Sequence, residues 1–122
     1  MAIPNIVNVS NIQGKSFGNT LTTSNALVLV NAASSGNCIK INNIVLANYS
    51  NAAATANVEY NRAAAGTGTA TFLVSQVSIP SGASLIVTDK STGFYMEEDT
   101  SIKAVSTTAS AVQIFLSYEV IS

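Results

Sequence analysis

The chain has 122 residues, a net charge of −1, no histidine and one cysteine, with 9% charged and 48% hydrophobic side chains. Disordered chains combine low hydrophobicity with high net charge, so this composition excludes disorder and predicts one folded domain with its own core. Without a histidine base, a cysteine pair or a cysteine-rich metal motif, we expect no enzyme and no catalytic, cofactor-binding or metal-binding residues.

The first twenty residues carry fewer apolar side chains than the rest of the chain. Pro4, Gly14 and Gly18 interrupt them, and we predict an extended segment over residues 1–20 with a strand near residues 6–12. This segment is either an edge strand of the parent domain or an arm that pairs with a neighbouring subunit by strand addition. The assembly-arm interpretation rests on Ile3, Ile6, Val7, Val9, Ile12 and Phe17.

From residue 21 onwards, short stretches rich in Val, Ile and aromatic residues recur at the spacing of an all-β protein, with Gly, Asn, Ser and Pro between them. We predict strands at residues 26–30, 38–49, 56–62, 69–79, 84–88, 93–96, 101–106 and 111–121. Together with the N-terminal strand they predict a single antiparallel β-sandwich of eight or nine strands, jelly-roll or Greek-key like, with its domain over residues 21–122.

Three of these strands have an informative periodicity. In the last one, alternate apolar residues should face the core: Val112, Ile114, Leu116, Tyr118 and Val120. In the third strand the apolar parity changes across Asn42 and Asn43, and in the fifth it changes across Ser75 and Gln76. Such changes predict β-bulges or strands that pass from one sheet to the other.

Two loops and the cysteine complete the set of candidate sites. The loop of residues 63–68 has only small side chains, so we expect it to be exposed and mobile. Glu97, Glu98 and Asp99 form an acidic cluster without the spacing of an EF-hand, and we expect an exposed acidic turn. Cys38 begins a predicted strand, where a lone cysteine is expected to be a buried apolar residue.

The surface chemistry points to assembly. The chain has 16 Ser, 13 Asn and 12 Thr, against 11 charged residues. Charge normally keeps small domains apart, and Lys or Pro normally protects exposed sheet edges. Charged residues and protective Lys or Pro residues are scarce in this chain. We therefore infer that sheet faces and edges are buried against other subunits, and we expect a homo-oligomer. The few basic residues are scattered and the densest apolar run is residues 26–30, so we expect neither nucleic acid nor a membrane as partner.

Several segments resemble a known family. Residues 94–103 (FYMEEDTSIK) place aromatic residues before an acidic pair, a turn and a Ser-Ile strand, and residues 116–122 contain Ser-Tyr-Glu. Residues 3–9 and the Ser-Ser-Gly turn of residues 34–36 are also similar. In these features the chain resembles small virion structural proteins of tailed bacteriophages, of the marine phage type, with Asp99-Thr100 in place of their Gly-Asp turn. The resemblance implies a non-enzymatic component that decorates the capsid or belongs to a tail or fibre.

We therefore expect a structural subunit of a bacteriophage virion, as capsid decoration (cement) or as a tail or fibre component. It would bind further copies of itself and other virion proteins, such as a major capsid or tail protein. Since the sequence shows no secretion signal, we expect the virion to be assembled in the host cytoplasm. The alternatives are a β-sandwich module that binds a host-surface glycan, and a self-assembling subunit of an extracellular filament.

Overall fold

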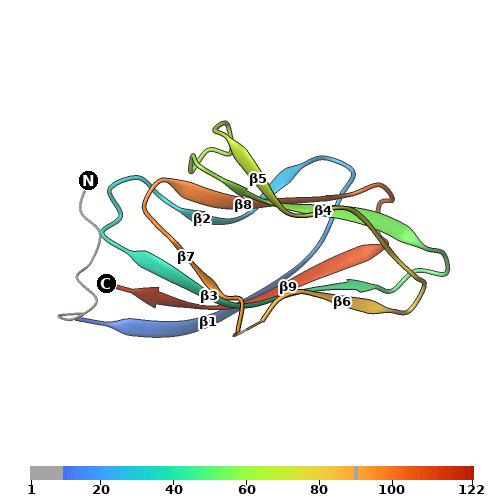
Figure 1. Ribbon diagram of the computed structural model, residues 1–122, viewed down its shortest axis with the longest axis horizontal. Coiled ribbons are helices and arrows are strands. Elements are labelled where there is room, and N and C mark those ends of the chain that lie inside the picture. The colour runs from blue at the N-terminus through green and yellow to red at the C-terminus, as the bar shows by residue number, and fades with distance from the viewer. Residues whose placement is uncertain (1–9, 90) are drawn as a thin grey trace.

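The computed structural model describes residues 10–89 and 91–122, which form two facing antiparallel sheets (Figure 1). Sheet A has the spatial order β1 (Ile12–Thr20), β9 (Val112–Ile121), β3 (Cys38–Asn48) and β6 (Ser84–Thr88), and β7 (Phe94–Met96) also pairs with β3. Sheet B has the order β2 (Ala26–Asn31), β8 (Thr100–Ser106), β4 (Ala54–Asn61) and β5 (Ala70–Ile79).

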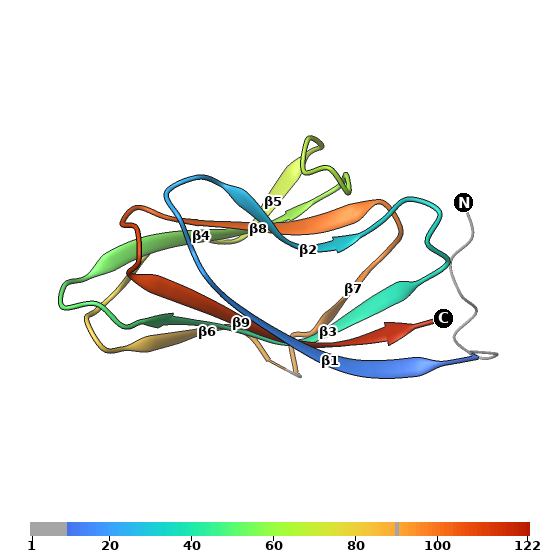
Figure 2. The same ribbon diagram turned by 180° about the vertical axis from the view of Figure 1, so that it is seen from behind.

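This strand order is that of a jelly roll. Apart from the short β7, each sheet has four strands. In each sheet a strand from the end of the chain lies between two earlier strands: β9 lies between β1 and β3, and β8 lies between β2 and β4. The chain crosses between the sheets from β1 to β2, from β2 to β3 and from β3 to β4, as Figures 1 and 2 show. The predicted fold class, an all-β jelly-roll sandwich, is confirmed.

The core lies between the sheets and follows the strand periodicity. Sheet A contributes the fully buried Ile41, Ile44 and Leu46 of β3, and Ile114 and Leu116 of β9. Sheet B contributes mainly smaller side chains of β4 and β8, with Ile102 of β8 and Ile79 of β5 as the largest fully buried ones. The predicted alternation in the last strand is confirmed: its even positions are buried or half-buried, whereas Phe115 between them is exposed.

Both predicted parity changes are β-bulges, and neither strand changes sheet. The register of β3 against β9 shifts between Ile41 and Asn43. In β5, the pairing moves from Val77 opposite Ala56 to Val74 opposite Val58, which leaves Ser75 and Gln76 as the bulge. Gln76 has a φ of 51°, and its N–H donates a hydrogen bond to Oδ1 of Asn57.

The first described strand lies further along the chain than the predicted one. The described strand β1 covers Ile12–Thr20, whereas residues 6–12 were predicted, and residues 1–9 lie outside the described part of the chain. Gly14 and Gly18 were interpreted as breaks. Instead both lie inside β1, because pairing with β9 uses only the backbone and an exposed edge strand does not need apolar side chains.

Three buried asparagines fix the loops that follow β2, β3 and β4. Asn31, Asn48 and Asn61 are the last residues of these strands, and each side chain is almost fully buried. In each case Nδ2 donates to two or more backbone carbonyl oxygens and Oδ1 accepts a hydrogen bond from the following loop. A carboxamide supplies two donors and one acceptor, so it satisfies buried loop backbone without any charge.

Candidate assembly surfaces

The structure places two of the six predicted arm residues. Ile3, Ile6, Val7 and Val9 lie outside the described residues. Ile12 and Phe17 lie on β1, with 55% and 37% of their surface exposed. β1 pairs with β9 of its own chain, so within a single chain residues 12–20 are an edge strand of sheet A.

The outer face of sheet A has an apolar row across four strands. Gly18 of β1 lies opposite Phe115 of β9, Phe115 lies opposite Val45 of β3, and Val45 lies opposite Ile86 of β6. Phe115 and Ile86 are 50% and 63% exposed. Next to this row is a surface hollow of about 410 Å³, lined by residues of β1, β3 and β9 that include Thr20, Ala47 and Phe115. The row itself is apolar and open, and the charged Lys40 and Glu119 lie opposite each other on the same face.

The outer face of sheet B is covered in part by the loop between β4 and β5. The carbonyl oxygen of Ala63 accepts a hydrogen bond from Oγ of Ser101 (2.8 Å), and that of Gly66 accepts one from Nζ of Lys103 (3.1 Å). Gly66 has a φ of +77°, and a Cβ there would lie 2.8 Å from Cδ of Lys103. The loop is exposed at Ala65, Thr67 and Gly68, as expected, but it is also bonded to sheet B, because its small residues allow the backbone to lie close to the sheet.

A buried glutamate lies at the centre of this outer face. Glu59 is opposite Lys103 on one side and Phe72 on the other, yet it is only 6% exposed. Its Oε1 accepts a hydrogen bond from Nδ2 of Asn25 (2.8 Å) and its Oε2 accepts one from Nδ2 of Asn61 (3.2 Å). Both carboxylate oxygens therefore have structural partners, and they help to hold the loops that adjoin sheet B.

The acidic cluster is not one exposed turn. Glu97 is exposed and Asp99 is half-buried, but Glu98 is only 3% exposed. Oε2 of Glu98 accepts a hydrogen bond from the backbone N–H of Gly36 (2.8 Å), and Oδ1 of Asp99 accepts one from that of Ala64 (2.9 Å). The prediction was wrong for Glu98 because its side chain turns inward to bind the loop between β2 and β3.

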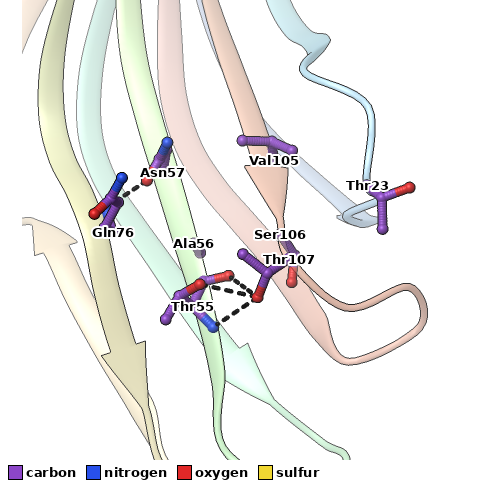
Figure 3. A pocket seen from close by; sticks show the side chains of 8 residues that line it. All are labelled: Thr23, Thr55, Ala56, Asn57, Gln76, Val105, Ser106 and Thr107. Carbon is purple, nitrogen blue, oxygen red and sulfur yellow. Dashed lines mark hydrogen bonds between the residues drawn. The ribbon is translucent and has the colours of Figure 1, made fainter.

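A second hollow, of about 550 Å³, lies beside β4 on sheet B (Figure 3). Its lining residues are Thr23, Thr55, Ala56, Asn57, Gln76, Val105, Ser106 and Thr107. In Figure 3 the hydroxyls of Thr55 and Thr107 point toward each other, at 2.9 Å. The hollow is lined by hydroxyl, amide and small apolar groups and by no charged or aromatic side chain.

Cys38 is buried, as expected, at the start of β3. Burial raises the pKa of its thiol, and the negative charge of Glu97 raises it further. Within residues 10–89 and 91–122, no three His, Cys, Asp or Glu side chains are grouped so that they could bind a metal ion. The same part of the chain has no helix that is long and apolar enough to span a membrane.

Comparison with known proteins gives the fold and no family. No family model and no curated protein sequence matches the chain. A solved structure from Bacillus endospore appendages, described as a novel family of disulfide-linked pili, is 12% identical with a TM-score of 0.55. The alignment covers 99% of this chain and 95% of that one.

Two further solved structures come from viruses. One is described by its triple jelly roll fold and turret assembly in an archaeal virus; it is 15% identical, with a TM-score of 0.52. The other is from Sulfolobus Turreted Icosahedral Virus and is 16% identical, with a TM-score of 0.54. Each alignment covers 94% of this chain but only 30% of the viral chain. At these identities the likeness shows a shared jelly-roll fold.

Proposed function

We propose that this protein is a non-enzymatic structural subunit of a bacteriophage virion that acts by assembling with copies of itself. The observation that carries the proposal is the combination of a nearly uncharged surface with an exposed edge strand, β1, and an open apolar row through Phe115 on sheet A. Contiguous apolar surface and free sheet edges favour association, and few charges oppose it.

Two further observations support this proposal. The fold is also found in the archaeal virus structures and in the pilus protein. The resemblance of residues 94–103 and 116–122 to small virion proteins of tailed bacteriophages favours a capsid decoration, tail or fibre component. Its partners would be a major capsid or tail protein, and its assembly would take place in the host cytoplasm.

In this proposal the N-terminal segment is an arm that contacts a neighbouring subunit. Ile3, Ile6, Val7 and Val9 would pair with a neighbouring subunit, as continuations of β1 beyond Ile12. Because β1 belongs to sheet A, the informative deletion is residues 2–9, which leaves every described strand intact. We expect this deletion to give a folded protein that assembles poorly. Normal assembly after the deletion would contradict a role as an arm.

The experiment that tests the main proposal compares the purified protein with purified virions. We expect a mass in solution, measured by light scattering, that corresponds to an oligomer. We also expect stoichiometric copies of the protein in virions by mass spectrometry, and a defined location by electron microscopy of labelled particles. A strictly monomeric protein at high concentration, absent from particles, would overturn the proposal.

A subunit of an extracellular filament is the second candidate. The specific observation in its favour is that the pilus protein aligns over 99% of this chain and 95% of its own length, so the two have the same overall extent. Filaments of the purified protein in negative-stain images, with no copies in virions, would favour this second function. The glycan-binding alternative has less support, because the hollow of Figure 3 has no aromatic side chain on which a sugar ring could stack.

A further inference from the structure

Of the edge strands in the described residues, β1 has the longest uninterrupted edge. It pairs with β9 over nine consecutive residues, from Ile12 to Thr20, with no register shift. The register of β2 shifts between Leu27 and Leu29, β5 is bulged, and β6 and β7 have only five and three residues. Bulges and short length are ways in which proteins blunt a sheet edge. The free edge of β1 is therefore the one best able to accept another strand.

β1 is also exposed on both of its faces. Eight of its nine residues are exposed, and only Thr20 is half-buried. Ordering a strand costs conformational entropy, which burial normally offsets. A single chain buries little of β1, so a partner that covers this strand would supply burial that the chain itself does not.

We propose that β1 pairs with β1 of a second copy of this chain, antiparallel, about a twofold axis at Ser16. The inference rests on the proposed assembly function and names the surface through which it begins. Directly opposite residues of an antiparallel pair have their side chains on the same face. The twofold axis must therefore lie midway between the two copies of one residue, which are directly opposite each other. Only an axis at Ser16 gives all nine residues, Ile12 to Thr20, a partner in the second copy.

The charge on β1 favours the same register. Lys15 is the one charged residue of the strand, and in this register it lies opposite Phe17 of the second copy, where its ammonium group can lie against the ring. An axis at Lys15 would instead place two lysines directly opposite each other, which is unfavourable. Gly14 lies opposite Gly18 of the second copy, so no side chains collide beside the axis. The pairing joins two copies of sheet A into one continuous sheet.

Cysteine cross-linking of the full chain tests the register. Ser16→Cys places two thiols directly opposite each other across the axis, with Cβ atoms about 4.5–5.5 Å apart, so a shift of about 1 Å between the two edge strands brings them to the roughly 3.5–4.5 Å of a disulfide. The matched control is Gly14→Cys, on the same face of the same strand, where a Cβ meets nothing within 4 Å. In the proposed register, position 14 of one copy lies four residues along the strand from position 14 of the other copy. With diamide as oxidant, we expect a disulfide-linked dimer from Ser16→Cys, and none from Gly14→Cys or from the wild-type chain with its buried Cys38.

A second variant tests the contact without covalent chemistry. Ser16→Lys puts two ammonium groups opposite each other and should raise the dimer dissociation constant by at least about tenfold. Gln13→Lys adds the same charge to β1 opposite Asn19 and should change it much less. Both positions are exposed, so the thermal unfolding midpoint should stay near that of the wild type.

The outcomes separate this inference from the proposed function. A protein that oligomerises without a Ser16→Cys cross-link, or that cross-links equally through Gly14→Cys, overturns the pairing at β1 and leaves the assembly function in place. Deletion of residues 2–9 should impair the larger assembly but keep the Ser16→Cys cross-link, because all nine paired residues lie in β1; loss of the cross-link would assign the contact to the arm and overturn the register. A protein that is monomeric at all concentrations overturns both.

Discussion

Replacement of Asn48 tests whether buried carboxamides hold the loops of this sandwich. Nδ2 of Asn48 donates to the carbonyl oxygens of Ala52 (2.8 Å) and Ile79 (2.9 Å), and Oδ1 accepts hydrogen bonds from the N–H and the hydroxyl of Ser50 (2.9 and 2.7 Å). Asn48→Ala removes all of these bonds. The carbonyl oxygen of Ile79 loses this donor within the interior, at about 1–3 kcal/mol, whereas the exposed carbonyl of Ala52 keeps the hydroxyl of Ser50 as a donor. Loss of the bonds to Ala52 and Ser50 adds roughly 1–2 kcal/mol.

The expected loss in the free energy of unfolding is therefore about 2–5 kcal/mol, a large share of the roughly 5–15 kcal/mol that stabilises a domain. The measurement is urea denaturation, with a lowered midpoint and an unchanged m-value, and calorimetry should show a midpoint lower by about 8–20 °C. Asn51→Ala is the control, because Asn51 is exposed in the same loop; it should stay within about 0.5 kcal/mol. If Asn48→Ala is equally mild, the carboxamide does not hold the loop.

Asn48→Asp sharpens the test. The new carboxylate keeps the acceptor for Ser50 but directs a second oxygen at the carbonyls of Ala52 and Ile79, so at pH 7 it should be at least as damaging as Asn48→Ala. Burial among acceptors raises the folded-state pKa of such a group. The protonated form is therefore favoured by folding, and the deficit should shrink as the pH falls. A deficit that does not depend on pH would contradict this geometry.

The remaining predictions concern ionisable groups. Glu98→Ala should lower the free energy of unfolding by about 1–3 kcal/mol, because the backbone N–H of Gly36 loses its acceptor, whereas the exposed Glu97→Ala should stay within about 0.5 kcal/mol by the same urea assay. Cys38, whose thiol pKa is raised by burial, should react with a thiol reagent at pH 8 far more slowly in the native chain than in denaturant; equal rates would contradict its burial. Hydrogen bonds from the side chain and backbone of Ser91 lower the pKa of Asp89, so their stabilising contribution is present above the ordinary aspartate range and is lost as the pH falls through the lowered value. An NMR titration of Asp89 with an ordinary midpoint would refute this.

Where a strand contributes to the core, its sequence was sufficient to predict it. The alternation of residues 111–121 identified the core face of β9, and the parity changes at Asn42–Asn43 and Ser75–Gln76 located both bulges. These signals exist because each strand has one buried and one exposed face. β1 has no buried face, so its sequence has no such signal and only the backbone pairing with β9 defines it.

The polar sites were less predictable, for a different reason. Neither Glu98 nor Asn31, Asn48 and Asn61 shows in the sequence that its side chain turns inward, since each looks like an ordinary polar residue near a loop. Their burial depends on backbone groups far along the chain, such as Ile79 for Asn48. What the three asparagines share is their position as the last residue of a strand, where the backbone passes into a loop.

The position of β9 in sheet A has a consequence for how the protein is made. β9 is the last described strand along the chain, yet it pairs with both β1 and β3, so Ile121 lies opposite both Ile12 and Cys38. The pairs of β3 with β6 and β7 can form earlier, but β1 cannot join sheet A until almost all of the chain is available, and the large sequence separation of the β9 pairs predicts slow folding. A chain that stops before β9 would leave β1 without a partner and Phe115 absent from the outer face. If the proposed assembly through sheet A is correct, only chains synthesised through β9 present its complete surface, so truncated products would be left out.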